Sequence, residues 1–273
     1  MYISPDMTAA QVEMTRAALG LDRPLFIQYV DWMANFLTGN MGFSFADRQP
    51  VLDIISQRLG PTLLLMSISL IVAYATAIPL GIKLDRAIIG WTFFNVSFPP
   101  FFLGLALIYI FAVELDLLPT GGMEVLGMEN DGIDLAEHLV LPVIVMAAQF
   151  SANMIRYVRA SVLEVLGQNY IRTALAKGLK WRQILRFHVL RNSLIPIVTV
   201  IGTDLPKVIG GAVITEQIFQ WPGIGSLTVA AINSRDYPVL MAIVILSAIA
   251  VLIANLTVDI AYAAIDPRIK YSK

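Results

Sequence analysis

Two residues of opposite charge lie inside an otherwise apolar stretch of the chain. Asp204 and Lys207 are the charged side chains within residues 193–215. Their spacing of three places them on neighbouring positions of one helix face, where the side chains can reach each other. Two roles remain open for this pair. It could be a structural ion pair that joins two helices, or a polar lining that a solute meets along a translocation path.

Residue types that support catalysis or metal binding are sparse. His138 and His188 are isolated, and the chain has no cysteine. The phosphate-binding pattern Gly-x-x-x-x-Gly-Lys-Ser/Thr is absent, because Gly-Lys occurs nowhere in the sequence. We therefore expect no catalytic site, no metal site and no cofactor bound by this chain, and we expect that it is not an enzyme.

Composition indicates the environment in which these residues lie. Apolar residues make up 57% of the chain and charged residues 14%, about half the usual charged share. Five apolar stretches approach or exceed the roughly 20 residues that a membrane span needs: 60–82, 87–113, 139–155, 193–215 and 237–258. These stretches predict an all-α integral membrane protein with five transmembrane helices. The net charge of -1 gives no reason to expect nucleic acid as a partner.

The loops between the spans predict the orientation, because short cytoplasmic loops are rich in Lys and Arg. Basic residues occupy the first connection, are absent between the second and third spans, and dominate the connection 156–192. We therefore expect an external segment at 1–59 and a transmembrane domain at 60–265. The loop 156–192 and the tail 266–273, with the C-terminus, should lie in the cytoplasm.

The segment 1–59 contains no apolar run that could act as a first span. Export of such a tail without a span before it is unusual. We therefore expect that a preceding transmembrane helix is absent from this chain. The alternative is a genuine start with a translocated tail.

The basic connection carries two predicted helices. Residues 170–178 read as a short helix stopped by Gly178. A second helix follows, and its apolar residues share one face at amphipathic spacing: Trp181, Ile184, Leu185, His188 and Val189. This pattern suits either docking into a groove on a soluble partner or contact with anionic lipid.

This region also carries a family resemblance. Residues 172–174 followed by Gly178 resemble the "EAA…G" loop of binding-protein-dependent ABC importer permeases, with Arg172 in place of the acidic residue. Further stretches resemble the dipeptide/oligopeptide/nickel branch of that family: 20–24, 42–50, 170–179, 188–196, 216–225, 234–238, 255–259 and 266–269. They follow the order of the family and cover almost the whole chain. The resemblance implies the type I importer permease fold, usually with six spans.

The resemblance also implies a function and a set of partners. The chain would be the permease subunit of an ABC importer for peptides or a related small solute, in a bacterial or archaeal cytoplasmic membrane. It would pair with a second, homologous permease, as a heterodimer, and with an extracytoplasmic binding protein. Two ABC ATPase subunits would bind ATP-Mg and contact a set of coupling residues, with Ala174 on the docked face. That set is Arg172, Thr173, Ala174, Lys177 and Gly178.

A second predicted feature lies on the external side. Trp221, Pro222 and Gly223 form a tight-turn segment that could frame the mouth of the path as an external gate. For Trp221, an aromatic anchor at the membrane interface is the alternative. The competing function is an ion-coupled secondary transporter, a class often built from inverted repeats. We find no such repeat in the sequence.

Overall fold

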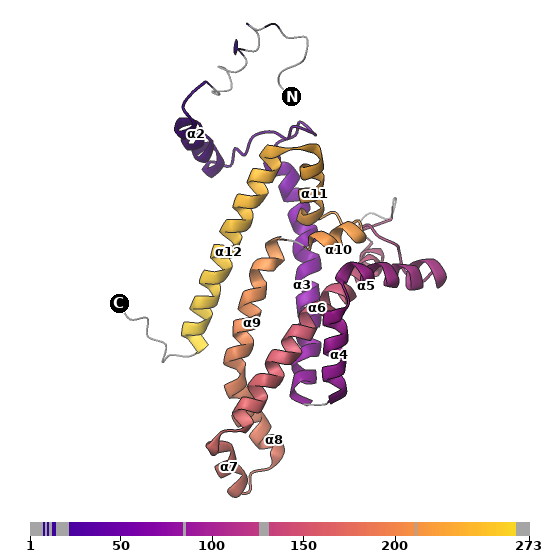
Figure 1. The fold of residues 1–273 in the computed structure, drawn as a ribbon, viewed down its shortest axis with the longest axis vertical. Helices are drawn as coiled ribbons and strands as arrows, with labels where there is room; N and C mark the ends of the chain where they lie inside the picture. Colours follow the sequence, from indigo (N-terminus) through magenta and orange to yellow (C-terminus); the bar gives the residue numbers. More distant parts are fainter. Residues whose placement is uncertain are drawn as a thin grey trace.

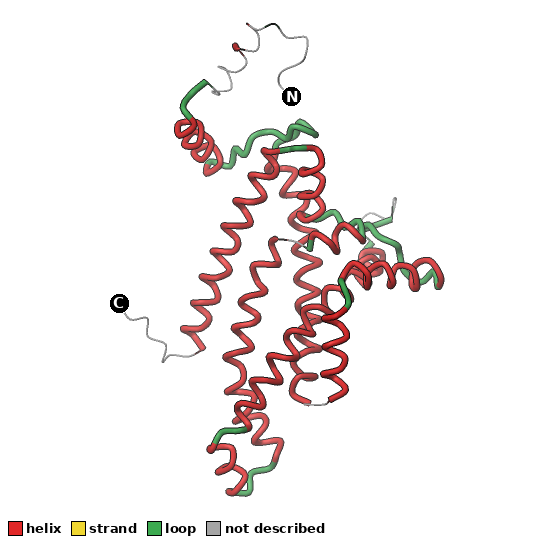
Figure 2. Tube along the Cα trace, viewed as in Figure 1, coloured by secondary structure: helices red, strands yellow, loops and turns green. Residues whose placement is uncertain are grey.

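The structure is a computed structural model that describes residues 8, 10, 13, 14, 22–83, 86–125, 131–210 and 212–265. Side chains at 86, 194–196, 199, 205–207, 209, 210 and 261–265 are outside this description. The described residues form helices joined by loops (Figure 1), with one isolated bridge between Phe43 and Pro50. Figure 2 shows that most of the described chain is helical. The all-α prediction is confirmed.

The elements follow one another from an outer helix to a long final helix. They are α2 (Leu25–Leu37), α3 (Val51–Lys83), α4 (Arg86–Ser97), α5 (Pro100–Leu107), the π-helix η1 (Ile108–Glu114), α6 (Gly132–Leu166), α7 (Asn169–Ala176), α8 (Trp181–Gln183), the π-helix η2 (Ile184–Val189), α9 (Leu190–Gly210), α10 (Val213–Ile218), α11 (Ile224–Ser234) and α12 (Tyr237–Ile265).

Three of the described helices, α3, α6 and α12, are long and apolar enough to cross a membrane. They contain the first, third and fifth predicted spans. α9, which contains most of the fourth predicted span, is a helix of 21 residues that is not among them. Ala87–Ser97 and Pro100–Glu114 form a bent pair of helices, and counting this pair as one span raises the number to four. The total of five spans stays a prediction.

The second predicted span is not one continuous helix. It is divided into α4 and a second part, α5 with η1, which are bent by 97° at a break between Ser97 and Pro100. Pro99 is extended, with φ -61 and ψ 137, and Pro100 occupies the first turn of α5. A proline has no N–H to donate and disfavours the helical conformation of the residue before it. The consecutive prolines therefore explain the corner.

The core joins the helices through tight contacts between small and branched residues. α3 and α6 pack together so closely that a Cβ added to Gly81 would lie 2.7 Å from the Cβ of Val158. α9 and α12 meet in the same way at Gly202, where an added Cβ would lie 2.5 Å from Val258. Larger side chains at either glycine would force these helices apart.

The helix bounds differ from the predicted divisions of the chain. α3 begins at Val51, so the boundary between 1–59 and 60–265 falls within one helix. α6 continues to Leu166 and α9 begins at Leu190, so residues 167–189, rather than 156–192, connect them. Apolar composition marks only the part of a helix that lies in lipid, and these helices extend beyond it. The tail 266–273 lies outside the described residues.

Candidate coupling surface and translocation elements

The predicted short helix before Gly178 is present as α7. Gly178 adopts the left-handed conformation with φ +78, which glycine accepts without steric cost. The backbone N–H groups of Lys177 and Gly178 donate to the carbonyls of Thr173 and Leu175 at 3.0 and 2.9 Å. These bonds satisfy carbonyls that would otherwise lack a partner at the helix end. α7 lies at the end of the molecule opposite to α2 (Figure 1).

The inner face of α7 packs on the core of the chain itself. Ile171 is 1% exposed and Ala174 is 5% exposed, and both belong to a cluster that includes Ile184 and Val189. The prediction that Ala174 lies on the docked face is therefore wrong. Periodicity gives α7 two faces, but it does not say which one the bundle covers.

The outer face of α7 is basic and exposed. Arg172, Thr173 and Lys177 are exposed, as is Gly178 at the turn. Thr173 donates its hydroxyl to the carbonyl of Asn169 at 3.1 Å, an ordinary helical bond that leaves the surface open. Four of the five predicted coupling residues therefore lie together on an accessible surface.

The predicted second amphipathic helix differs in register. It consists of one turn, α8, followed by the π-helix η2. Ile184 and Val189 are fully buried, whereas Trp181 is 51% exposed. Although the wider i to i+5 bonding of a π-helix changes which side chains share a face, Ile184, Leu185, His188 and Val189 lie on a buried or half-buried face as predicted, and the prediction is wrong for Trp181 alone.

Asp204 lies between two helices. Its side chain on α9 is 6% exposed and accepts a hydrogen bond of 2.8 Å from the hydroxyl of Tyr74 on α3. The side chain of Lys207 lies outside the described residues, so the predicted pairing of the two charges is not tested. In this conformation a solute could reach Asp204 only if α3 and α9 moved apart.

Trp221 is part of the interior. Its side chain is 0% exposed, and its Nε1 donates to the carbonyl of Pro61 at 3.0 Å. Leu65 and Leu139 belong to the same buried cluster. The interfacial-anchor alternative does not fit a fully buried indole. Any gating role of this segment must come from movement of its backbone rather than from exposed aromatic surface.

Glu216 holds this segment in place, and the sequence prediction missed it. The side chain is 0% exposed, and its two oxygens accept hydrogen bonds of 2.9 Å from the Thr62 hydroxyl and the Ser226 backbone N–H. A Cβ added to Gly223 would collide with the Glu216 carboxyl group. An acid followed by closely spaced glycines in an apolar region was the signal that could have revealed it.

A second buried acid links the external segment to the last helices. Asp236, between α11 and α12, is 2% exposed. It accepts hydrogen bonds from the Ser44 hydroxyl and from the backbone N–H of Phe45 at 3.1 Å. The loop before α3 is thus fixed to the corner between α11 and α12.

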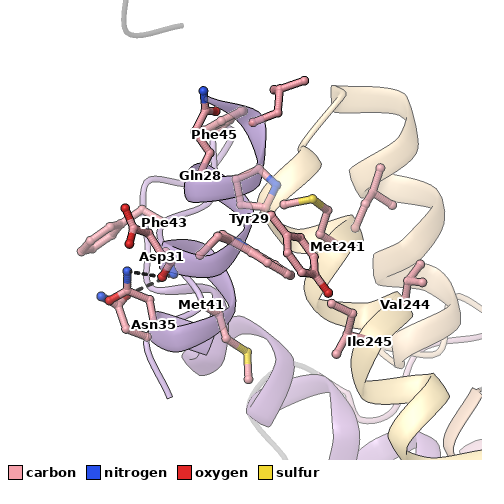
Figure 3. Close-up of a pocket in the computed structure, with 16 residues that line it drawn as sticks. Gln28, Tyr29, Asp31, Asn35, Met41, Phe43, Phe45, Met241, Val244 and Ile245 are labelled. Atoms are coloured by element: carbon pink, nitrogen blue, oxygen red, sulfur yellow. Dashed lines mark hydrogen bonds between the residues drawn. The ribbon is translucent and has the colours of Figure 1, made fainter. Parts of the chain in front are cut away.

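An apolar groove of about 970 Å³ separates α2 from α12 near this corner. Figure 3 shows Tyr29 and Met41 on one side and Met241, Val244 and Ile245 on the other. Its walls offer mainly apolar surface, which does not suit a polar solute. The groove is separate from Asp204 and from α7.

Metal-binding geometry is not found in the described part of the chain, where no three His, Asp or Glu side chains gather at a suitable distance. His138 instead contacts the Asp134 carboxyl group at 3.4 Å and the carbonyl of the same residue at 2.9 Å. This histidine is 5% exposed and serves the packing at the start of α6.

The helical bundle, the protruding basic helix α7 and the span-length apolar helices together define a membrane transport subunit. Residues 65–271 match the sequence family of binding-protein-dependent transport system inner membrane components, and the chain belongs to this family. Residues 4–67 match the family of N-terminal segments of binding-protein-dependent transport system membrane components. The chain is therefore a multi-pass inner membrane protein and a permease subunit of an ABC importer, not an enzyme.

Individual relatives support the branch predicted from the motifs. The oligopeptide transport system permease protein AppB of Bacillus subtilis is 42% identical, with 99% of this chain and 89% of AppB covered. A putative peptide permease protein of Brucella suis is 40% identical, covering 98% and 88%. The glutathione transport system permease protein GsiC of Escherichia coli K12 is 38% identical, covering 99% and 88%. The resemblance to the dipeptide/oligopeptide branch is confirmed.

A solved structure supports the fold. A chain of the inward-facing MetNI methionine ABC transporter superposes with a TM-score of 0.61 at 19% identity, covering 78% of this chain and 96% of that chain. At this identity the likeness concerns the fold alone. It confirms the predicted type I importer permease architecture.

Proposed function

We propose that this permease carries peptides or a related small solute, using ATP-Mg bound by two separate ATPase subunits. A second, homologous permease would complete the path as a heterodimer, and an extracytoplasmic binding protein would deliver the solute. The chain itself would bind no cofactor. The names of its relatives, which include oligopeptide and peptide permeases, support the substrate class.

The observation that carries this proposal is the two-faced construction of α7. Its inner residues Ile171 and Ala174 join the core, while the basic side chains of Arg172 and Lys177 and the hydroxyl of Thr173 remain exposed. This outer face and Gly178 would dock on an ATPase subunit, with the C-terminus also in the cytoplasm. Closure of the ATPases can shift the permease between two states only through contacts that differ between those states.

The other predicted residues take their places along the path in this proposal. Asp204 and Lys207 would form a polar lining that becomes accessible when α3 and α9 separate. Trp221, Pro222 and Gly223 would belong to an external gate whose position depends on Glu216. The buried indole and the hydrogen bonds of Glu216 support a segment that moves as one unit.

A cross-linking experiment tests the coupling surface. The chain has no cysteine, so Thr173→Cys provides a single attachment point for a photoreactive thiol reagent. We expect light to join it to a subunit that contains a phosphate-binding loop. Gln49→Cys, exposed at the other end, is the matched control and should not produce this product. ATP-driven uptake without any cross-link from position 173 would contradict the assignment.

The competing function, ion-coupled secondary transport, makes the opposite prediction in vesicles. An importer of the ABC class needs ATP and its ATPase subunits, and its uptake should survive collapse of the ion gradients. A secondary transporter should accumulate solute without ATP and should stop when an ionophore is added. The two functions are therefore separated by one uptake measurement under both conditions.

A further inference from the structure

A polar stripe runs along one side of α6 in its cytoplasmic half. Gln149, Asn153 and Arg156 recur at intervals of four and three residues and therefore share one helix face. Asn153 and Arg156 are exposed. Such groups rarely face lipid, because each polar side chain in the hydrocarbon region is costly. The stripe needs a polar partner from outside this chain.

Three exposed apolar residues in the first half of α6 lie on the side opposite to the polar stripe, whereas Tyr157 and Leu163, in its second half, are exposed beside the stripe. The three are Ile133, Val140 and Ile144, which are 73%, 38% and 44% exposed. At 3.6 residues per turn, they are about half a turn around the helix from the polar stripe. An apolar face suits lipid or a hydrophobic neighbour. The opposite face, with its amides and guanidinium, suits a polar route.

The direction of the Arg156 side chain argues against a lipid headgroup as its partner. Gly81, close to the end of α3, packs on Val158 and Ile155, so Arg156 lies near the cytoplasmic end of the span. An arginine that serves a headgroup extends away from the middle of the bilayer. Arg156 instead donates from Nη2 to Oδ1 of Asn153 at 2.6 Å, one turn nearer the middle.

Apart from the bond between Arg156 and Asn153, the donors on this stripe lack a charged acceptor within the described chain. The ion pairs among the described residues are Arg23–Asp31 and Asp134–His138, so Arg156 has no acidic partner there. Nε2 of Gln149 is buried and, within the same described set, has no hydrogen-bond partner. A guanidinium with amide groups beside it offers several N–H donors, which is the arrangement that a carboxylate accepts.

We propose that Gln149, Asn153 and Arg156 form a carboxylate-binding site in the translocation path, which recognises the C-terminal carboxylate of a peptide. This inference rests on the proposed function, because it assumes a peptide as the solute. Arg156 supplies the charge and Asn153 fixes the guanidinium. Gln149 lies about one turn before Asn153; its N–H is buried in this conformation and would join the site only when the neighbouring side chains move.

The test uses the assembled transporter in vesicles and a mixture of short peptides, each present as the free acid and as the C-terminal amide. Mass spectrometry of the vesicle contents gives the ratio of acid to amide that was transported. We expect the native protein to favour the acid. Arg156→Gln should lower that ratio about tenfold, as loss of a hydrogen bond to a charged group predicts. Arg156→Lys should retain part of the preference.

Controls separate the possible outcomes. Tyr157→Phe changes the neighbouring exposed side chain and should leave the ratio unchanged. An unchanged ratio in Arg156→Gln assigns any preference to the binding protein and overturns the inference. The inference is also overturned if Arg156→Gln lowers the uptake of the acid and of the amide equally. It is overturned as well if removal of anionic lipid lowers uptake by the native protein but not by Arg156→Gln. If the native protein transports neither form with ATP, the proposed function itself fails.

Discussion

The hydroxyl of Thr62 on α3 donates a hydrogen bond of 2.9 Å to Glu216 on α10, a residue 154 positions further along the chain. The same hydroxyl accepts a bond of 2.7 Å from the backbone N–H of Ile224 at the start of α11. Thr62 and Glu216 therefore connect α3 with both short helices that follow α9. This relationship makes the position of the segment around Trp221 depend on two buried side chains.

Glu216→Ala is expected to loosen this segment. The substitution leaves the Thr62 hydroxyl and the Ser226 N–H without an acceptor, at a cost of about 1–3 kcal/mol for each buried group. The midpoint of thermal unfolding of the assembled transporter in detergent measures the loss. Gln217→Ala, on the exposed side of the same helix, removes only a solvent-exposed bond of 3.3 Å to the Ser226 carbonyl and is the matched control. Equal stability of Glu216→Ala and the native protein would contradict a structural role for these bonds.

Substitutions on the two faces of α7 should have different effects. Ala174→Glu buries an unpaired charge, which costs several kcal/mol or forces the helix away from the core, so the yield of folded protein should fall. Arg172→Glu with Lys177→Glu changes only exposed side chains. This double variant should insert normally and lose ATP-driven uptake. The measurements are the amount of monodisperse protein and the uptake rate. A well-folded Ala174→Glu protein would show that α7 does not pack as described.

The bond between Tyr74 and Asp204 allows a test of the polar lining. Asp204→Asn should preserve assembly and basal ATPase activity while lowering uptake of the solute. Tyr74→Phe removes only the donor of the 2.8 Å bond and should cost about 1.5–3 kcal/mol of stability if Asp204 is charged. The structural alternative has a different signature. Asp204→Asn would fail to assemble, and Lys207→Met in the same protein would restore assembly.

The predicted orientation can be tested with cysteines in the loop before α3. Gln49 is exposed, whereas Ser44 is 2% exposed and bonded to Asp236. An impermeant thiol reagent should label Gln49→Cys in intact cells rapidly and Ser44→Cys slowly. The buried position is the control for accessibility. Labelling of Gln49→Cys that appears only after the cells are opened would reverse the topology.

Much of the fold could be predicted because each long apolar run must form a helix in a membrane. The runs located α3, α6 and α12, and the positive φ of Gly178 agrees with the predicted end of α7. Local sequence could not give the orientation of α7, since the contact of Ala174 with the core depends on residues far along the chain. The pairing of Thr62 with Glu216 was hidden for the same reason.

The corner at Pro99 and the π-helix η2 show a different difficulty. Both prolines were visible in the sequence, but hydropathy alone cannot distinguish a kinked span from two helices that meet at 97°. Ile184 and Val189 of η2 are buried, as their place on the predicted stripe implied, but Trp181 of α8 is exposed. Periodicity fitted to a single α-helix does not predict the exposure of Trp181.

The cluster that joins Ile171 and Ala174 to Ile197 and Val200 has a mechanical consequence. Protein interiors are as densely packed as organic crystals and compress very little. A displacement of α7 therefore cannot be absorbed by compression of the cluster on which it packs. The force must pass to the helices that share this cluster, chiefly α6 and α9, as tilt or rotation about the cluster.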